Sequence, residues 1–147
     1  MVDLVFKGAL YSDIENPNEK DQTIIVENAI RRSLEKLKSL NVLILLDNPT
    51  TPFSPSLCKR PFSFRKNMCE FYSNDNQHQI RRILIKKIAK EFTNVKVFDL
   101  SSLFCNNNHC TMKIGNNLLF RDDNHLNLAG SRFVAPFIAD QISTFNE

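Results

Sequence analysis

Hydrophobic positions recur along this chain with two different spacings, which predict alternating strands and helices. Short stretches rich in apolar and β-branched residues predict buried strands, at 2–6, 42–46 and 95–99. Apolar residues three or four positions apart predict helices, over 19–40 and 76–92. The buried face of the second of these helices is predicted to carry Ile80, Leu84, Ile88 and Phe92.

Breaks in this pattern predict the connections. Four prolines fall between positions 47 and 75, so we interpret that stretch as a long structured loop. Residues 111–120 predict a small hairpin that turns at Gly115. Asn127 is placed to cap a last helix, which continues through Pro136, a residue expected to kink it.

The order of these elements predicts an α/β fold in which a parallel sheet lies between two layers of helices. In such sheets the active site lies at the carboxyl ends of the strands. The loops that follow residues 6, 46 and 99 are therefore expected to meet at one edge of the sheet.

Composition limits the class of protein. The 147 residues, 42% of them hydrophobic, predict a single domain over 1–147. A net charge of +3 is too small to indicate nucleic acid, and the basic residues of the 76–92 helix fit a solvated face. We therefore expect no nucleic-acid partner. No apolar run approaches the roughly 20 residues of a membrane helix, and Asp3 lies where a signal peptide carries positive charge.

Four cysteines add a second constraint. They form two local pairs, Cys58 with Cys69 and Cys105 with Cys110, and their even number favours disulfides and an oxidising compartment. Because the chain shows no export signal, this predicts a piece of a larger, exported protein. A zinc site with His109 or His78 is an alternative, although only the second pair approaches the spacing of zinc ligands. Four reduced thiols are a further alternative.

The stretch with the clearest chemistry is Asp122-Asp123-Asn124-His125, just ahead of the last helix. An imidazole can take a proton from a hydroxyl nucleophile and return it to a leaving group. A carboxylate on the other ring nitrogen fixes the tautomer and stabilises the imidazolium. The same spacing also occurs in ordinary capped loops, so spacing alone does not establish catalysis.

The residues around this stretch resemble a known family. Asp122 to Asn127, followed by Ala129-Gly130, is similar to the last block of SGNH hydrolases. The similarity is greater to the SGNH domain fused to acyltransferase-3 membrane proteins, the O-acetyltransferases of bacterial surface polysaccharides. In that branch a short cysteine loop, here Cys105 to Cys110, and a hairpin precede the aspartate-rich block. Leu43 to Pro49, with a proline-rich tail leading to Cys58, is also similar.

This resemblance implies an SGNH-like three-layer fold that lacks its first strand, and disulfides Cys58–Cys69 and Cys105–Cys110. It implies that His125 is the catalytic base and Asp122 its orienting acid, with Asp123 as a rival for that role. It also implies a carbohydrate substrate, an acyl donor, a membrane acyltransferase domain in the same protein, and a periplasmic location. No cofactor or metal is expected.

One part of the family pattern is missing. The family's nucleophile lies in a Gly-Asp-Ser block, and no such block occurs in these 147 residues. Ser12, Ser101 and Ser102 follow predicted strands, but serines there are usually turn or capping residues. We therefore expect acyl transfer or ester hydrolysis, as O-acetylation of a cell-surface carbohydrate, by a longer parent to which this chain contributes Asp122 and His125. A non-catalytic remnant or carbohydrate-binding module with the same fold is the alternative, and a small cytosolic protein with an accidental resemblance is a third.

Overall fold

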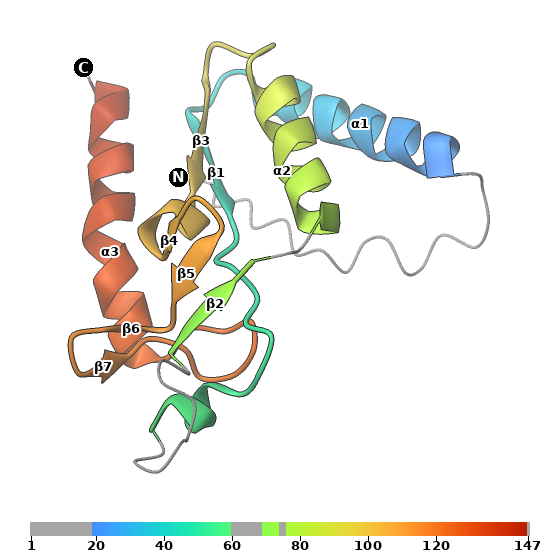
Figure 1. Ribbon diagram of the computed structural model, residues 1–147. Helices are drawn as coiled ribbons and strands as arrows, with labels where there is room; N and C mark the ends of the chain where they lie inside the picture. Colours follow the sequence, from blue (N-terminus) through green and yellow to red (C-terminus); the bar gives the residue numbers. More distant parts are fainter. Residues whose placement is uncertain (1–18, 60–68, 74–75, 147) are drawn as a thin grey trace. The chain divides into compact units, whose positions relative to one another are not determined.

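The computed structural model describes residues 19–59, 69–73 and 76–146, in which helices and strands are mixed (Figure 1). The α/β class predicted from the sequence is confirmed. The strand predicted at 2–6 and the candidate Ser12 lie outside the described residues.

The chain divides into two compact units. Unit 1 extends to Leu46 and resumes over Asn76–Phe98. Unit 2 consists of Asp47–Asp75 and Asp99–Glu147. The chain therefore passes into unit 2 directly after each of the two apolar strands predicted at 42–46 and 95–99.

Unit 1 is built from two helices and two strands. In chain order they are α1 (Glu19–Lys36), β1 (Val42–Leu46), α2 (Asn76–Ala89) and β3 (Val95–Asp99). The two strands are neighbours in a parallel sheet, as predicted, and α1 packs against α2. Because parallel strands end at the same edge of a sheet, the residues after β1 and after β3 both start from that edge.

The core of unit 1 lies between these helices and strands. Leu34 of α1, Val42 and Ile44 of β1, and Ile88 of α2 are completely buried. One predicted core position is wrong, because Ile80 is 63% exposed. Among the described side chains, the core contacts α2 from Leu84 onward, so about the first two turns of the helix extend past the packed region.

Asn94 holds the turn that follows α1, which ends at Lys36 where the sequence predicted helix as far as residue 40. Its side-chain amide donates hydrogen bonds to the carbonyl oxygens of Leu37 (3.1 Å) and Leu40 (2.7 Å), and its own carbonyl accepts the N–H of Val42 (2.9 Å). This residue, distant in sequence, therefore fixes the turn from α1 into β1.

Unit 2 contains a three-stranded antiparallel sheet that the sequence did not predict. Its strands, in spatial order, are β2 (Glu70–Tyr72), β5 (His109–Thr111) and β4 (Cys105–Asn106). The stretch 47–75 was expected to be a loop, but it contains β2 and a short 3-10 helix, η2 (Pro55–Lys59). Strands of two or three residues are too short to show an alternating pattern, so they exist because of their pairing partners.

Two disulfides, Cys58–Cys69 and Cys105–Cys110, lie in unit 2 and confirm the pairing that the family resemblance implied. The second joins directly opposed residues of β4 and β5. All four sulfurs are consumed, which removes the thiolates required by the alternative zinc site.

Replacing both Cys105 and Cys110 by alanine is expected to lower the free energy of unfolding by about 2 kcal/mol, because a six-residue loop is no longer closed in the unfolded chain. Urea denaturation of the variant beside the wild-type chain measures this difference. Equal midpoints and equal slopes would contradict it. Adding a reductant should lower the stability of the wild type and leave this variant less affected, since only the Cys58–Cys69 bridge remains to be broken.

The rest of unit 2 leads to the last helix. A hairpin of β6 (Lys113–Ile114) and β7 (Asn117–Leu118) turns at Gly115, as predicted. Gly115 has a φ of +56°, which glycine adopts without steric cost. Helix α3 (Leu128–Ser143) then begins after Asn127 and is followed by the 3-10 turn η4 (Thr144–Asn146). It is continuous through Pro136, so the proline does not end it.

Asn127 fixes the start of α3, as the sequence predicted. Its side-chain oxygen accepts the N–H of Gly130 (2.9 Å), which is an N-cap bond. Its side-chain amide donates to the carbonyls of Leu118 (2.7 Å) and Phe120 (3.3 Å), and its backbone N–H donates to Leu119 (2.9 Å). The helix is thereby joined to the segment before it, and the residues between them form a closed loop.

Candidate functional site

The Asp122–His125 segment is a short loop whose two ends are tied together. Phe120 and Leu126 form an isolated antiparallel bridge. Inside it, the backbone N–H of Arg121 donates to the carbonyl of His125 (2.8 Å). The two ends of the loop therefore lie side by side, and Asn127 caps α3 directly after the loop.

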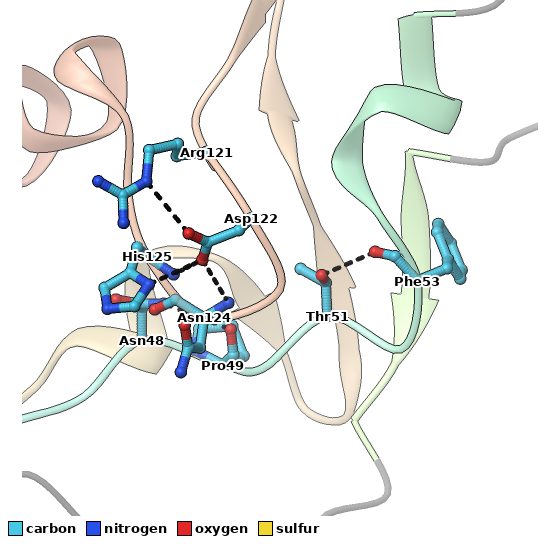
Figure 2. A network of polar contacts seen from close by, with 8 residues as sticks. All are labelled: Asn48, Pro49, Thr51, Phe53, Arg121, Asp122, Asn124 and His125. Carbon is cyan, nitrogen blue, oxygen red and sulfur yellow. Dashed lines mark hydrogen bonds and ion pairs between the residues drawn. The ribbon is translucent and has the colours of Figure 1, made fainter.

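The carboxylate of Asp122 accepts most of the hydrogen bonds within this loop (Figure 2). Its Oδ1 accepts the ring Nδ1 of His125 (2.8 Å), the backbone N–H of His125 (2.8 Å) and the backbone N–H of Asn124 (3.2 Å). Its Oδ2 accepts Nε of Arg121 (3.1 Å). The carboxylate thus holds both the backbone of His125 and its ring, which fixes the direction of the imidazole.

These contacts decide the charge of Asp122. Partial desolvation raises the pKa of its carboxyl, but the hydrogen bonds from His125, from the Asn124 N–H and from Arg121 lower it by more. The net result is a pKa well below the ordinary value for aspartate, so the group is an anion at neutral pH. An ionised carboxylate only accepts hydrogen bonds. The Nδ1 atom of His125 must therefore carry the hydrogen, which leaves the lone pair of a neutral ring on Nε2.

The lone pair on Nε2 is accessible. The side chain of His125 is 50% exposed, and within the part of the chain that the structure describes its Nε2 makes no hydrogen bond. An imidazole whose Nδ1 donates to a carboxylate, and whose Nε2 makes no hydrogen bond, is arranged to accept a proton from a hydroxyl group at Nε2.

Asp123 does not share in this arrangement. Its side chain is exposed and makes no hydrogen bond to the ring of His125 in the described structure. Its backbone carbonyl instead accepts the N–H of Thr51 (2.6 Å). Of the two aspartates that the sequence left as rivals, Asp122 is the one that contacts the imidazole.

The candidate serines have other partners. Ser101 donates its hydroxyl to the carboxylate of Asp99 (2.6 Å), and Ser102 donates its hydroxyl to the carbonyl of Asp99 (2.7 Å). Asp99 is the N-cap of η3 (Leu100–Leu103), so both serines belong to a capped turn. Among the described residues no serine hydroxyl hydrogen-bonds to His125.

His109 lies on β5 and not in an open loop. Its Nε2 is 3.4 Å from a carboxylate oxygen of Glu70, and its ring packs edge-on against Tyr72. Over the described ranges, no group of three or more His, Cys, Asp or Glu side chains is arranged to hold a metal ion. No helix within those ranges is long and apolar enough to cross a membrane.

Sequence reasoning missed two residues beside the loop, Asn48 and Thr51. Both are buried and lie beside the loop (Figure 2). Asn48 donates its side-chain amide to the carbonyl of Asn124 (3.1 Å), and Thr51 donates its backbone N–H to the carbonyl of Asp123. The signal was present in the sequence, since a polar Asp-Asn-Pro-Thr-Thr run follows a buried strand at its carboxyl end. We expected that edge to be functional but assigned no role to a residue of the loop after residue 46.

Comparison with known proteins gives one match. The family described as "SGNH domain (fused to AT3 domains)" matches residues 3–140, which is nearly the whole chain. No curated protein and no solved structure matches the chain.

Proposed function

Because this chain belongs to the family of SGNH domains fused to AT3 domains, we propose that it contributes the base and the orienting acid of an acyl-transfer site in a longer protein. The proposed reaction moves an acyl group, most simply acetyl, to a hydroxyl of a cell-surface carbohydrate, or removes it. The observation that supports this is the short bond between Asp122 and the Nδ1 of His125, with Nε2 left open.

In the proposed mechanism a serine outside these 147 residues attacks the carbonyl of the acyl donor, and its proton passes to Nε2 of His125. The imidazolium, stabilised by Asp122, returns that proton to the leaving group. A carbohydrate hydroxyl then attacks the acyl-serine and gives its proton to Nε2. The proton returns to the serine oxygen as the ester forms, so His125 ends as it began.

The partner and the compartment are part of the same proposal. Membership of a family in which the SGNH domain is fused to AT3 domains supports a membrane acyltransferase domain as the source of the acyl group. Two disulfides are typical of proteins in oxidising compartments, which supports a periplasmic location for this segment. A membrane acyltransferase domain and a periplasmic location both fit a carbohydrate acceptor at the cell surface.

The test of this function uses cells that produce the longer protein. Their surface polysaccharide is expected to carry acetyl groups released by mild alkali, which cleaves esters and spares amides. Cells without the gene should lack these groups. The DNA upstream of codon 1 is expected to encode a Gly-Asp-Ser block and membrane helices. Identical acetyl content in both cell types would contradict the proposal.

The 147-residue chain alone is expected to hydrolyse p-nitrophenyl acetate no faster than an equal concentration of free imidazole, because it contains no Gly-Asp-Ser nucleophile. Absorbance of released nitrophenolate measures the rate, and His125→Ala is the matched control. Turnover well above the imidazole rate that His125→Ala abolishes would show that this chain is catalytic by itself. It would also exclude the non-catalytic remnant that the sequence left as the alternative.

A further inference from the structure

The two peptide groups between Asp123 and His125 are each held from both sides. On the N–H side, Oδ1 of Asp122 accepts from Asn124 (3.2 Å) and from His125 (2.8 Å). On the carbonyl side, the oxygen of Asp123 accepts the N–H of Thr51 (2.6 Å), and the oxygen of Asn124 accepts Nδ2 of Asn48 (3.1 Å). Residues that follow β1 therefore supply the donors for both of these carbonyl oxygens.

Three of the four donors in these bonds are backbone N–H groups, and the fourth, Nδ2 of Asn48, is the only side-chain donor among them. It is 7% exposed, and with Thr51 it makes up the buried polar residues of the described chain. A buried amide is costly unless its donors are satisfied. Its Nδ2 donates to Asn124 and, at 3.4 Å, to the carbonyl of Pro49, while its backbone N–H donates to Oδ1 of Asp47 (3.0 Å).

We infer that Asn48 is a positioning residue for the Asp122–His125 pair. The Asn124–His125 peptide is the link between them, because its N–H and the ring Nδ1 bind the same oxygen of Asp122. If Nδ2 of Asn48 releases the carbonyl of this peptide, the peptide is free to rotate and carries its N–H away from Oδ1. The imidazole then loses the fixed direction in which Nδ1 donates and Nε2 is open.

The whole arrangement belongs to unit 2, since it joins residues 47–51 to residues 121–125. The pair is therefore built without any residue of unit 1. Thr51 contributes through its backbone, and its hydroxyl donates to the carbonyl of Phe53 (2.9 Å). Neither hydrogen bond of Thr51 involves the side chain of Asn48, so both are kept when Asn48 is substituted. A variant at position 48 therefore tests the positioning of the ring while the segment stays attached to the loop through Thr51.

The experiment observes the imidazole directly, by proton and nitrogen-15 NMR of the labelled 147-residue chain. Asn48→Asp keeps the size of the side chain and removes the donor, and Asn48→Ala removes the donor without adding charge. In wild type we expect a downfield Nδ1–H signal from His125 and the Nδ1–H tautomer. In both variants we expect that signal to be lost by exchange and the tautomers to become mixed.

Asn106→Asp is the matched control, because Asn106 is an exposed asparagine on β4 and should leave the His125 signals unchanged. Dispersed amide signals from Met112 and Leu119, both buried in unit 2, establish that each variant is folded. An unchanged Nδ1–H signal and tautomer in both folded Asn48 variants would overturn the inference.

The catalytic consequence rests on the proposed function. In the longer protein, Asn48→Asp and Asn48→Ala are expected to lower kcat by about 10- to 100-fold, because small misplacements of a catalytic group cost that much. The KM for the acyl donor should not change. If His125→Ala left activity intact, the proposed function would fail while the NMR result stood. If His125→Ala abolished activity and both Asn48 variants kept the wild-type kcat, the positioning role would fail alone.

Discussion

Replacing His125 by alanine in the longer protein is expected to reduce acyl transfer by at least about 10³-fold. The ring is the only group in the loop with both an anion behind it and an open nitrogen in front. In the proposed mechanism, its loss leaves the serine and the carbohydrate hydroxyl without an acceptor for their protons. Acetyl groups transferred to the polysaccharide, normalised to the amount of protein, give the measurement.

The matched control for this substitution is His109→Ala. His109 is similarly exposed and also lies beside a carboxylate, that of Glu70, but on β5 and outside the loop. Its removal should leave the rate within a factor of about two, since surface substitutions away from a site change little. Retention of transfer by folded His125→Ala protein would show that the base lies elsewhere.

Asp122→Asn should resemble the loss of the base, with a fall of about 10³- to 10⁴-fold, because an amide can donate to Nδ1 and favour the tautomer with hydrogen on Nε2. That tautomer has no lone pair facing the reacting hydroxyl. Asp123→Asn in the same assay should stay close to wild type, since the Asp123 side chain makes no hydrogen bond to the ring among the described residues and its backbone carbonyl keeps the bond from Thr51. Reversed effects of the two substitutions would make Asp123 the orienting acid.

The Asp122–His125 pair could be predicted because it is local. The two groups are three positions apart, and a turn that brings such neighbours together is set by the carboxylate accepting the following backbone N–H groups. The choice between Asp122 and Asp123 was not decided by the residues themselves, because both lie within reach of the ring. In the structure the backbone N–H of Thr51 donates to the carbonyl of Asp123, and Nε of Arg121 donates to Oδ2 of Asp122. The bond from Thr51 depends on the fold, because Thr51 is distant in the sequence.

The elements that the sequence predicted correctly depend on nearby residues, whereas those it missed depend on residues distant in the sequence. β1, β3 and the start of α3 are predicted by residues within them or next to them. These are five-residue stretches rich in apolar residues and the capping side chain of Asn127. β2 was missed because Phe71 is buried only through pairing with Cys110, a residue about forty positions away. Asn48 was missed likewise, since the carbonyl that explains its burial belongs to Asn124.

The C-terminal side of the Asp122–His125 loop packs closely around one glycine. Gly130 is buried in the first turn of α3, where its N–H donates to the capping oxygen of Asn127. A Cβ atom added at Gly130 would overlap the carbonyl oxygen of Leu119 and lie 3.1 Å from Cβ of Leu126. Both obstacles are close to the backbone, and Leu119 O already accepts the N–H of Asn127. Neither can rotate away as the end of a long side chain would.

Gly130→Ala is therefore expected to lower the free energy of unfolding by about 3 kcal/mol, the upper range for overpacking in a buried site. The direction of the change in the free energy of unfolding is informative, because alanine in place of glycine inside a helix ordinarily stabilises the helix by about 1 kcal/mol. Urea denaturation followed by far-UV circular dichroism measures the change. Ser131→Ala, the exposed neighbour on the same helix, should be neutral or slightly stabilising. If Gly130→Ala were as stable as wild type, α3 would be free to move away from Leu119, and the loop that holds His125 would not depend on that contact.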